Sequence, residues 1–255
     1  MASKPGYVEI YPEIYQIPGI QRSAHAYLVK GRRKNVLIDT GLPTTTDHLL
    51  NCLSDLGLHQ RDIHMVLLTH EHIDHAGGAP IFNGSALLAA HRLAANKLAL
   101  KDEFALMNRV FDQGVDDFEI DVLLQEGASI NLGNYELEIL HTPGHCSGGI
   151  SIYEPNHRLL FSGDTIMANG IIGGVLGSGN ASDYIHTLKC LSTLKIAHLY
   201  PGHGRLSTTA EADILVGIER LQNLLDDSKQ LFDAIKHTSH GFDHITRSLR
   251  DLNCK

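Results

Sequence analysis

The segment "THEHIDH", residues 69–75, concentrates side chains of the types that bind divalent metal ions. Imidazole and carboxylate groups both suit zinc and similar ions. In an extended segment His70 and His72 point the same way because they are two positions apart, while Asp74 and His75 lie beyond a turn and can face a neighbouring position. A single open catalytic zinc site takes about three protein ligands and a water. Residues 69–75 offer more ligands than one such site needs, which predicts two metal ions.

Three later segments each place one more ligand type at the end of an apolar run, before a loop that contains glycine. They are "HTPGH" with His145, "FSGDT" with Asp164 and "YPGHG" with His203. Loops at strand ends are where a rigid scaffold commonly presents reactive groups. Together with residues 69–75, they supply enough ligands for two ions, and one carboxylate can bridge them.

Asp39, in "LIDTG", has two interpretations that the sequence does not separate. It can be a turn acid that caps the helix expected near Thr44, or it can bind the far ring nitrogen of a ligating histidine and fix its tautomer. The remaining histidines favour ordinary surface or capping roles, with His141 ranked higher because it shares a loop with His145. Cys146 is interpreted as a small, partly buried bystander rather than a thiolate ligand.

The elements that must position these residues follow from apolar patterning. Strands are expected in 7–17, 24–41 (two strands), 63–69, 129–132, 135–140, 149–153, 158–162 and 197–200, and helices in 44–56 and 183–194. A capping box of Thr208 and Glu211 predicts a long amphipathic helix after it. The sequence does not decide whether the stretch 104–126 forms a helix or an excursion over the site. Two similar rounds of strands and helices predict two sheets packed face to face, with helices outside.

Composition sets the class of molecule. With 255 residues and 43% apolar content, we expect one α/β domain over 1–255, in which 209–255 is a helical segment packed near the site. A net charge of −8 disfavours nucleic acid and anionic membranes as partners. The sequence shows neither a signal-peptide pattern nor a membrane-spanning stretch, and its cysteines are widely spaced. These features predict a cytoplasmic protein, and a homodimer is compatible with them.

The combination of "HEHIDH", "HTPGH", "GD" and "PGHG" resembles the metallo-β-lactamase-fold hydrolase superfamily, in its glyoxalase II-like or lactonase-like branch. The resemblance implies an αββα four-layer sandwich of two mixed sheets, with a dinuclear site where the sheets meet. It also implies two divalent ions, with zinc expected and iron or manganese as alternatives. By motif, His70, His72 and His145 would hold one ion, Asp74, His75 and His203 the other, and Asp164 would bridge.

The chain departs from several branches of that superfamily. Many lactonases that it resembles carry a catalytic tyrosine three residues after the bridging acid, where this chain has Met167. The segment "TIMANGIIGGVL" replaces the stretch typical of glyoxalase II, and the extra domains of the nucleic-acid-processing branches are not evident. Exported β-lactamases often carry another residue at the Asp164 position. The sequence also lacks a GxSxG elbow and a phosphate-binding P-loop.

The predicted function is hydrolysis of a small acyl substrate, a thioester, ester or lactone. A hydroxide that bridges the ions would attack, because metal binding brings the pKa of water from 15.7 to near 7. Asp74 would orient it and pass a proton to the leaving group. The uncharged stretch 165–180 either lines the mouth or packs against the C-terminal helix. The rival functions are phosphodiester or nucleic-acid cleavage, iron-dependent sulfur dioxygenation and a regulatory role.

Overall fold

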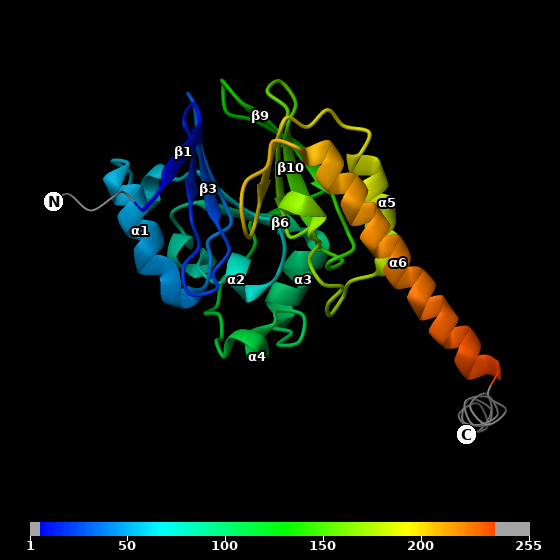
Figure 1. Ribbon diagram of the computed structural model, residues 1–255. Coiled ribbons are helices and arrows are strands. Elements are labelled where there is room, and N and C mark those ends of the chain that lie inside the picture. The colour runs from blue at the N-terminus through cyan, green and yellow to red at the C-terminus, as the bar shows by residue number, and fades with distance from the viewer. Residues whose placement is uncertain (1–5, 238–255) are drawn as a thin grey trace.

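The computed structural model describes residues 6–237, with side chains described up to residue 229. Two β-sheets form its centre (Figure 1). The first has seven strands in the order β1 (Val8–Tyr11), β2 (Ile14–Ile17), β3 (Ala26–Lys30), β4 (Asn35–Ile38), β5 (Met65–Leu68), β6 (Leu87–His91) and β7 (Val122–Leu124). The second has five, in the order β12 (His198–Pro201), β11 (Leu159–Gly163), β10 (Ile150–Glu154), β9 (Glu136–His141) and β8 (Ser129–Asn131).

Both sheets are mixed, as expected. In the first, β1 to β4 pair antiparallel and β4 to β7 pair parallel. In the second, β8 to β11 pair antiparallel and β12 joins β11 in parallel. The apolar run that ends in β5 is a strand paired on both sides, between β4 and β6. A strand in that position is covered on both faces, which explains its unbroken hydrophobic sequence.

Helices cover the outer face of each sheet. They are α1 (Thr46–Asp55) and α3 (Arg92–Leu100) on the first sheet, and α5 (Ala181–Leu191) and α6 (Ala210–His237) on the second. One apolar core lies between the two sheets and two more lie between a sheet and its helices. The result is the αββα sandwich that the motif resemblance implies, and Figure 1 shows its layers in sequence across the molecule.

Short helical segments make up most of the remaining regular structure. They are η1 (Pro43–Thr45), η2 (Gln60–Asp62), α2 (Ile73–Ala76), η3 (Ala79–Phe82), α4 (Asn108–Phe111) and η4 (Ala168–Gly170). The strand β6 and the helix α3 are not among the elements expected from the sequence, because "LLAAHRLAANKLAL" runs from strand into helix without a glycine or proline between them. The uncertain stretch 104–126 holds only α4 and β7, with turns and irregular chain elsewhere.

The topology brings distant loops to one edge of the sandwich. The parallel strands β4 and β5 end beside each other, so Asp39 and Thr69 follow them at the same edge of the first sheet. In the second sheet β11 and β12 are also parallel and end at Gly163 and Pro201. The 142–149 loop between β9 and β10 reaches the same edge, because Ile150 N donates to Thr69 O at 2.8 Å. Parallel register therefore gathers the motif loops.

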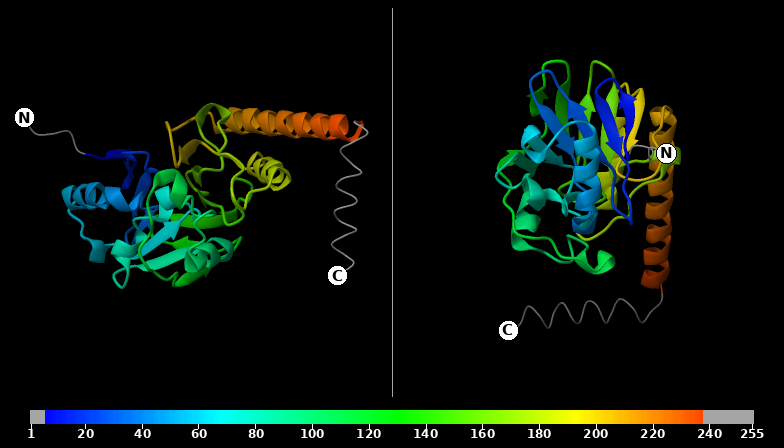
Figure 2. Two further views of the ribbon diagram at one scale, coloured as in Figure 1. Left: turned by 90° about the horizontal axis from the view of Figure 1, so that it is seen from below. Right: turned by 90° about the vertical axis from the view of Figure 1, so that its left-hand side faces the viewer.

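Helix α6 supports the segment that follows Asp164. Asn169 N donates to Asp213 Oδ1 at 2.7 Å, and Gly170 packs so closely on Val216 that an added Cβ would lie 2.5 Å from it. Figure 2 shows the rest of α6 extending away from the sheets. Residues 238–255 of the expected C-terminal segment lie outside the described residues. In the described part of the chain, no helix is long and apolar enough to cross a membrane.

The start of α6 differs from the expected capping box. Among the described residues no hydrogen bond joins Thr208 to Glu211. Instead, the Ser207 hydroxyl accepts from Thr209 N at 3.0 Å and donates to the Asp213 carboxylate. The pattern identifies the helix start correctly, but its hydrogen bonds come from Ser207, which precedes the helix and also pairs with Leu199 across an isolated bridge.

Candidate metal centre

Three histidines converge at the edge of the sandwich. His70 Nε2 lies 3.0 Å from His72 Nδ1, and His145 Nε2 lies 3.0 Å from the same His72 atom. Around a tetrahedral zinc ion with Zn–N distances near 2.0–2.1 Å, ligand nitrogens lie roughly 3.3 Å apart. The spacing of the three nitrogens is therefore close to that of a tripod for one ion, and the three residues form a cluster capable of binding metal.

The charge state of this cluster suits a metal. Burial lowers the pKa of His70 well below its usual value, and it lowers the pKa of His72 to about 3. Neighbouring histidines act in the same direction, since like charges in a small volume repel. His70 and His72 therefore stay neutral at neutral pH, and a neutral imidazole has one ring nitrogen with a lone pair that can bind a metal.

A second cluster adjoins the first and contains carboxylates. His203 Nε2 lies 3.0 Å from Asp74 Oδ2, and His75 Nε2 lies 3.3 Å from Asp164 Oδ1. The other oxygen of Asp164 lies 3.8 Å from both His145 Nε2 and His203 Nε2. Asp164 thus faces both clusters, which is the position a bridging carboxylate needs. His75 Nε2 and Asp164 Oδ1 are buried without a hydrogen-bond partner among the described residues.

The electrostatics of the second cluster favour a cation. Burial alone would lower the pKa of His75, but Asp164, Asp39 and Asp74 outweigh it and raise that pKa well above its usual value. Burial alone would raise the pKa of Asp164, but His75, then His145 and His203, hold it well below the usual range. Buried unpaired atoms and concentrated negative charge both fit a divalent ion here.

Asp39 contacts His75 rather than capping a helix. Its Oδ2 accepts from His75 Nδ1 at 2.8 Å and from Thr69 Oγ1 at 2.8 Å, while its Oδ1 accepts from Thr69 N at 2.8 Å. Neither η1 nor α1 has a side-chain cap. Of the two interpretations of Asp39, the geometry matches a carboxylate that fixes the ring of a histidine in a cluster capable of binding metal, with Nε2 of that ring facing Asp164.

Residues 171–179, here called the glycine loop, lie against both Asp164 and His145. Gly174 O accepts from His145 Nδ1 at 2.6 Å, Leu176 N donates to His145 O at 3.2 Å, and Gly173 N donates to Asp164 O at 3.0 Å. The stretch contacts the candidate site and also packs against the C-terminal helix. Its central part adjoins the site, while Ile172 packs in the core beneath α6.

Other supporting residues carry no signal in the sequence. His25 Nδ1 accepts from Gly19 N at 2.9 Å while its Nε2 lies 2.8 Å from Gly204 O, so His25 fixes the loop that carries His203. The Tyr184 hydroxyl, from α5, binds the backbone oxygens of Asp164 and Thr165 at 2.9 and 2.7 Å. These partners lie far apart in sequence, so only the fold brings them together.

Two residues near His145 do not point into the clusters. Burial, and then the Glu71 carboxylate, raise the pKa of the Cys146 thiol well above its usual value, so the thiol stays neutral, as a bystander would. The ring of His141 stacks on His91 with 4.1 Å between ring centroids, and its Nε2 donates to Ser147 O at 3.0 Å. His141 therefore supports the loop after His145 and belongs to none of the three clusters that could hold a metal.

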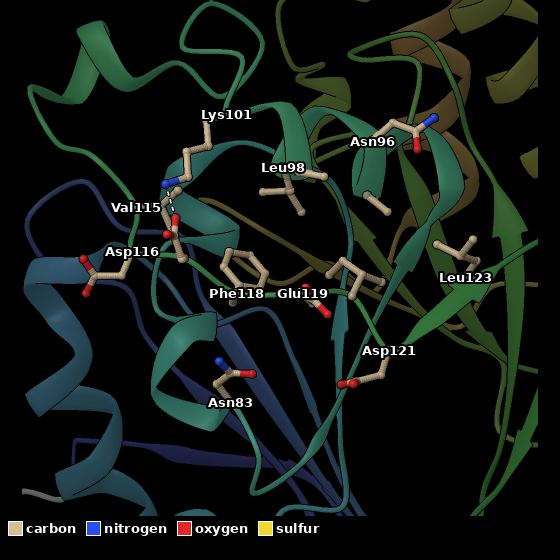
Figure 3. A pocket seen from close by; sticks show the side chains of 14 residues that line it. Asn83, Asn96, Leu98, Lys101, Val115, Asp116, Phe118, Glu119, Asp121 and Leu123 are labelled. Carbon is tan, nitrogen blue, oxygen red and sulfur yellow. Dashed lines mark ion pairs between the residues drawn. The ribbon is translucent and has the colours of Figure 1, made fainter.

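A separate groove of about 870 Å³ lies on the far side of α3, between that helix and the chain before β7. Figure 3 shows its acidic lining, including Asp116, Glu119 and Asp121, and the ion pair from Lys101, which is made to Asp117. None of the residues in the metal-binding clusters at the sheet edge lines this groove. The clusters that could hold a metal therefore lie outside this groove.

An αββα sandwich with clustered histidines and aspartates at the sheet edge defines a class, the metal-dependent hydrolases of this fold. The chain belongs to the metallo-beta-lactamase superfamily, whose family profile matches residues 19–203. It is 31% identical to the human (Homo sapiens) acyl-coenzyme A thioesterase MBLAC2 over 208 residues, covering 71% of this chain and 72% of the relative. It is also 31% identical over 201 residues to a probable metallo-hydrolase of Methanocaldococcus jannaschii, covering 76% and 93%.

Solved structures agree on the fold. A metallo-beta-lactamase family protein from Thermus thermophilus superposes with a TM-score of 0.74 at 22% sequence identity, covering 86% of this chain and 82% of the other. The subclass B3 metallo-beta-lactamase BJP-1 of Bradyrhizobium japonicum gives a TM-score of 0.69 at 22% identity, covering 89% of this chain. The predicted fold class and the assignment to a metal-dependent hydrolase are confirmed.

Proposed function

We propose that this protein hydrolyses small acyl substrates, thioesters foremost and esters or lactones of similar size. The observation that carries the proposal is the glycine loop, which joins His145 and Asp164 to an apolar surface. The human relative named above is an acyl-coenzyme A thioesterase, and its 31% identity supports the same bond type.

We assign two divalent ions to the centre, with zinc expected. His70, His72 and His145 would hold one ion, here called the tri-histidine site. The other ion would be held by Asp74, His75 and His203, with Asp164 between the two. When bound, such ions lower the pKa of water and polarise a substrate carbonyl oxygen, which is the chemistry that acyl hydrolysis requires.

Asp74 is the residue we assign to proton transfer. Burial would raise its pKa, but His75 and the hydrogen bond from His203 outweigh that effect and lower it. The carboxylate is therefore ionised and able to accept a proton from an attacking water. His203 has a side chain that is 31% exposed, so this side of the centre opens to solvent and to an incoming substrate.

The apolar surface lies on the segments that border the centre. Ile171, Val175 and Leu176 of the glycine loop are exposed to 49%, 37% and 37%. Phe104 is 74% exposed and lies near the glycine loop at Gly177, where an added Cβ would lie 3.7 Å from Phe104 O. Exposed apolar groups beside a polar centre favour an acyl chain over a phosphate backbone.

The test is a comparison of kcat/KM over acyl-CoA thioesters of increasing chain length, acyl-homoserine lactones, a glutathione thioester, a phosphodiester and a cephalosporin. We expect the highest value for an acyl thioester, with a gain as the chain lengthens onto the apolar surface. A Phe104→Ser substitution should flatten that gain and leave the shortest substrate unchanged.

Leu100→Ser is the matched control, since Leu100 is 79% exposed and belongs to α3, outside the glycine-loop contact. A phosphodiester preferred tenfold, roughly 1.4 kcal/mol of transition-state binding, would reject the acyl assignment. A flat response to chain length in the wild type would reject the role of the apolar surface.

A further inference from the structure

A partly buried lysine lies behind the tri-histidine site and has no role in the chemistry proposed above. Lys97, in the last turn of α3, donates from Nζ to Glu71 Oε1 at 2.6 Å and to Ser147 Oγ at 2.6 Å, and it also donates to Ser178 Oγ. Its side chain is only 15% exposed and that of Glu71 is completely buried. All three ammonium protons are therefore used in one enclosed cluster.

The three acceptors come from the three segments that build one side of the centre. Glu71 lies between His70 and His72, and its side chain points to the opposite side of the extended chain. Ser147 follows His145 by two positions, and Ser178 belongs to the glycine loop. One ammonium group thus connects the segment of two metal-binding histidines, the loop of the third, and the loop that covers it.

Ser178 closes the cluster. Its hydroxyl accepts from Lys97 and from Ser147 N at 3.0 Å, and it donates to Glu71 Oε1 at 3.1 Å. A hydroxyl has one proton and two lone pairs, so its hydrogen-bonding capacity is filled. A position filled in this way defines one orientation of the loop, since any displacement of Ser178 breaks all three bonds at once.

We propose that Lys97, Glu71 and Ser178 form a latch that holds the glycine loop on His145 and keeps the tri-histidine site assembled. Lys97 is then a positioning residue: it contacts neither the metal-binding nitrogens nor the substrate. The latch acts through the backbone contacts of the loop, which are Gly174 O with His145 Nδ1 and Leu176 N with His145 O. This inference rests on the proposed assignment of a metal to that site.

A charge-removing substitution alone would be ambiguous. Lys97→Met leaves the Glu71 carboxylate buried without its cation, and its Oε2 already lacks a hydrogen-bond partner among the described residues, so the variant could lose stability for that reason alone. The double variant Glu71→Met with Lys97→Met removes both charges, and buried ion pairs are often replaceable by apolar groups without loss of fold. The double variant therefore separates an effect on the position of the glycine loop from an effect on the stability of the fold.

The experiment measures Co²⁺ and Zn²⁺ affinity by chelator competition, together with amide hydrogen exchange of residues 174–180 in the metal-free protein. For the double variant we expect a normal melting temperature and faster amide exchange at Leu176 and Asn180. We also expect metal affinity at one of the two sites to fall about 10–100-fold, the loss typical when a residue that supports a metal ligand is removed. Ser178→Ala keeps the ion pair and should speed that exchange with a smaller loss of affinity. Lys189→Met, on the exposed face of α5, is the control and should change neither.

The outcomes separate the inference from the function proposed above. A wild-type protein that binds no metal would reject the metal assignment, whereas the exchange result tests the latch without metal. A folded double variant with wild-type affinity at both sites and wild-type exchange over 174–180 would overturn the latch.

Discussion

The cluster of His70, His72 and His145 contains only imidazoles, whereas three carboxylates surround His75 in the adjoining cluster. Burial keeps His70 and His72 of the first cluster neutral, and the carboxylates make the second cluster favourable for positive charge. The supports differ as well. His75 is fixed by a side chain at the end of a central strand, and His145 by a backbone oxygen in a surface loop.

The difference indicates that the two clusters of the centre are not equally rigid. Asp39 is 2% exposed and adopts a left-handed backbone with φ of 58°, held between neighbouring parallel strands. Gly174 is exposed, and the loop that carries it depends on contacts with His145, Asp164 and the latch. A site on strand ends is intrinsically more rigid than one completed by a loop. We therefore expect the tri-histidine site to respond more strongly to distant substitutions.

The largest expected effect comes from removing the residue that both clusters share. Asp164→Ala should reduce metal content at both sites and lower kcat/KM by roughly a thousandfold, since several kcal/mol of charge stabilisation depend on the ions. Elemental analysis and turnover of the best acyl substrate check this together. Asp164→Asn, which keeps the shape, is the control for folding. Two ions and full turnover in the alanine variant would show that Asp164 does not bridge.

The second prediction tests the tri-histidine site, whose His145 is held by the glycine loop. In Gly173→Ala the new Cβ would lie 2.6 Å from Asp164 O and 2.6 Å from His145 Nδ1, so the loop must move off the centre. We expect a loss of affinity at one site towards the upper end of about 10–100-fold. Gly174→Ala is the matched control, because the atoms nearest to its Cβ would be those of the Leu176 side chain, at 3.3 Å or more. Equal affinities in the two variants would contradict the role of the loop.

The third prediction tests the cluster that contains His75, which Asp39 holds at the end of β4. In Asp39→Asn the amide oxygen can keep the bond from Thr69 N, but the amide NH₂ then faces His75 Nδ1. His75 must move its proton to Nε2 to accept that bond, and Nε2 is the atom that faces Asp164. We expect about tenfold weaker binding at one site only. Metal titration followed by NMR of the histidine ring nitrogens would reveal the tautomer, and an unchanged Nδ1–H would refute the mechanism.

The sequence predicts the two halves of the centre unequally. Every proposed metal-binding residue lies in a short motif after an apolar run, so residue type and spacing identify candidates without the fold. Asp39 is identifiable because it ends a strand, though its partner is not. The contacts of Gly174 with His145 and of Lys97 with Glu71 span 29 and 26 residues, respectively. Such pairs leave no periodic signal, and the patterning does not predict α3, the helix that carries Lys97.

The smallest expected effect concerns His91, which supports the loop of His145 through its contact with His141. His91, at the start of α3, is buried, stacks on His141, and accepts from Leu93 N at 3.4 Å. Burial, then His141, Arg92 and Lys97, lower its pKa to about 4. The unfolded chain binds a proton near pH 6.5. Between these values the unfolded state holds more protons than the folded state, so the free energy of unfolding must fall as the pH falls.

His91→Asn removes this titration and keeps a side chain suited to a helix start. Urea unfolding of the metal-free variant should show a smaller loss of stability than the wild type between about pH 6.5 and 4.5, with the two curves running parallel above about pH 7.5, where both states are neutral at this position. His186→Asn, at an exposed position of α5, is the control. His72 is also shifted, to about 3, but it contributes equally to both proteins and cancels in the difference. If the variant lost stability as steeply as the wild type over that range, the protonation of His91 would not be linked to unfolding, and the stacked pair behind the His145 loop would be only a packing contact.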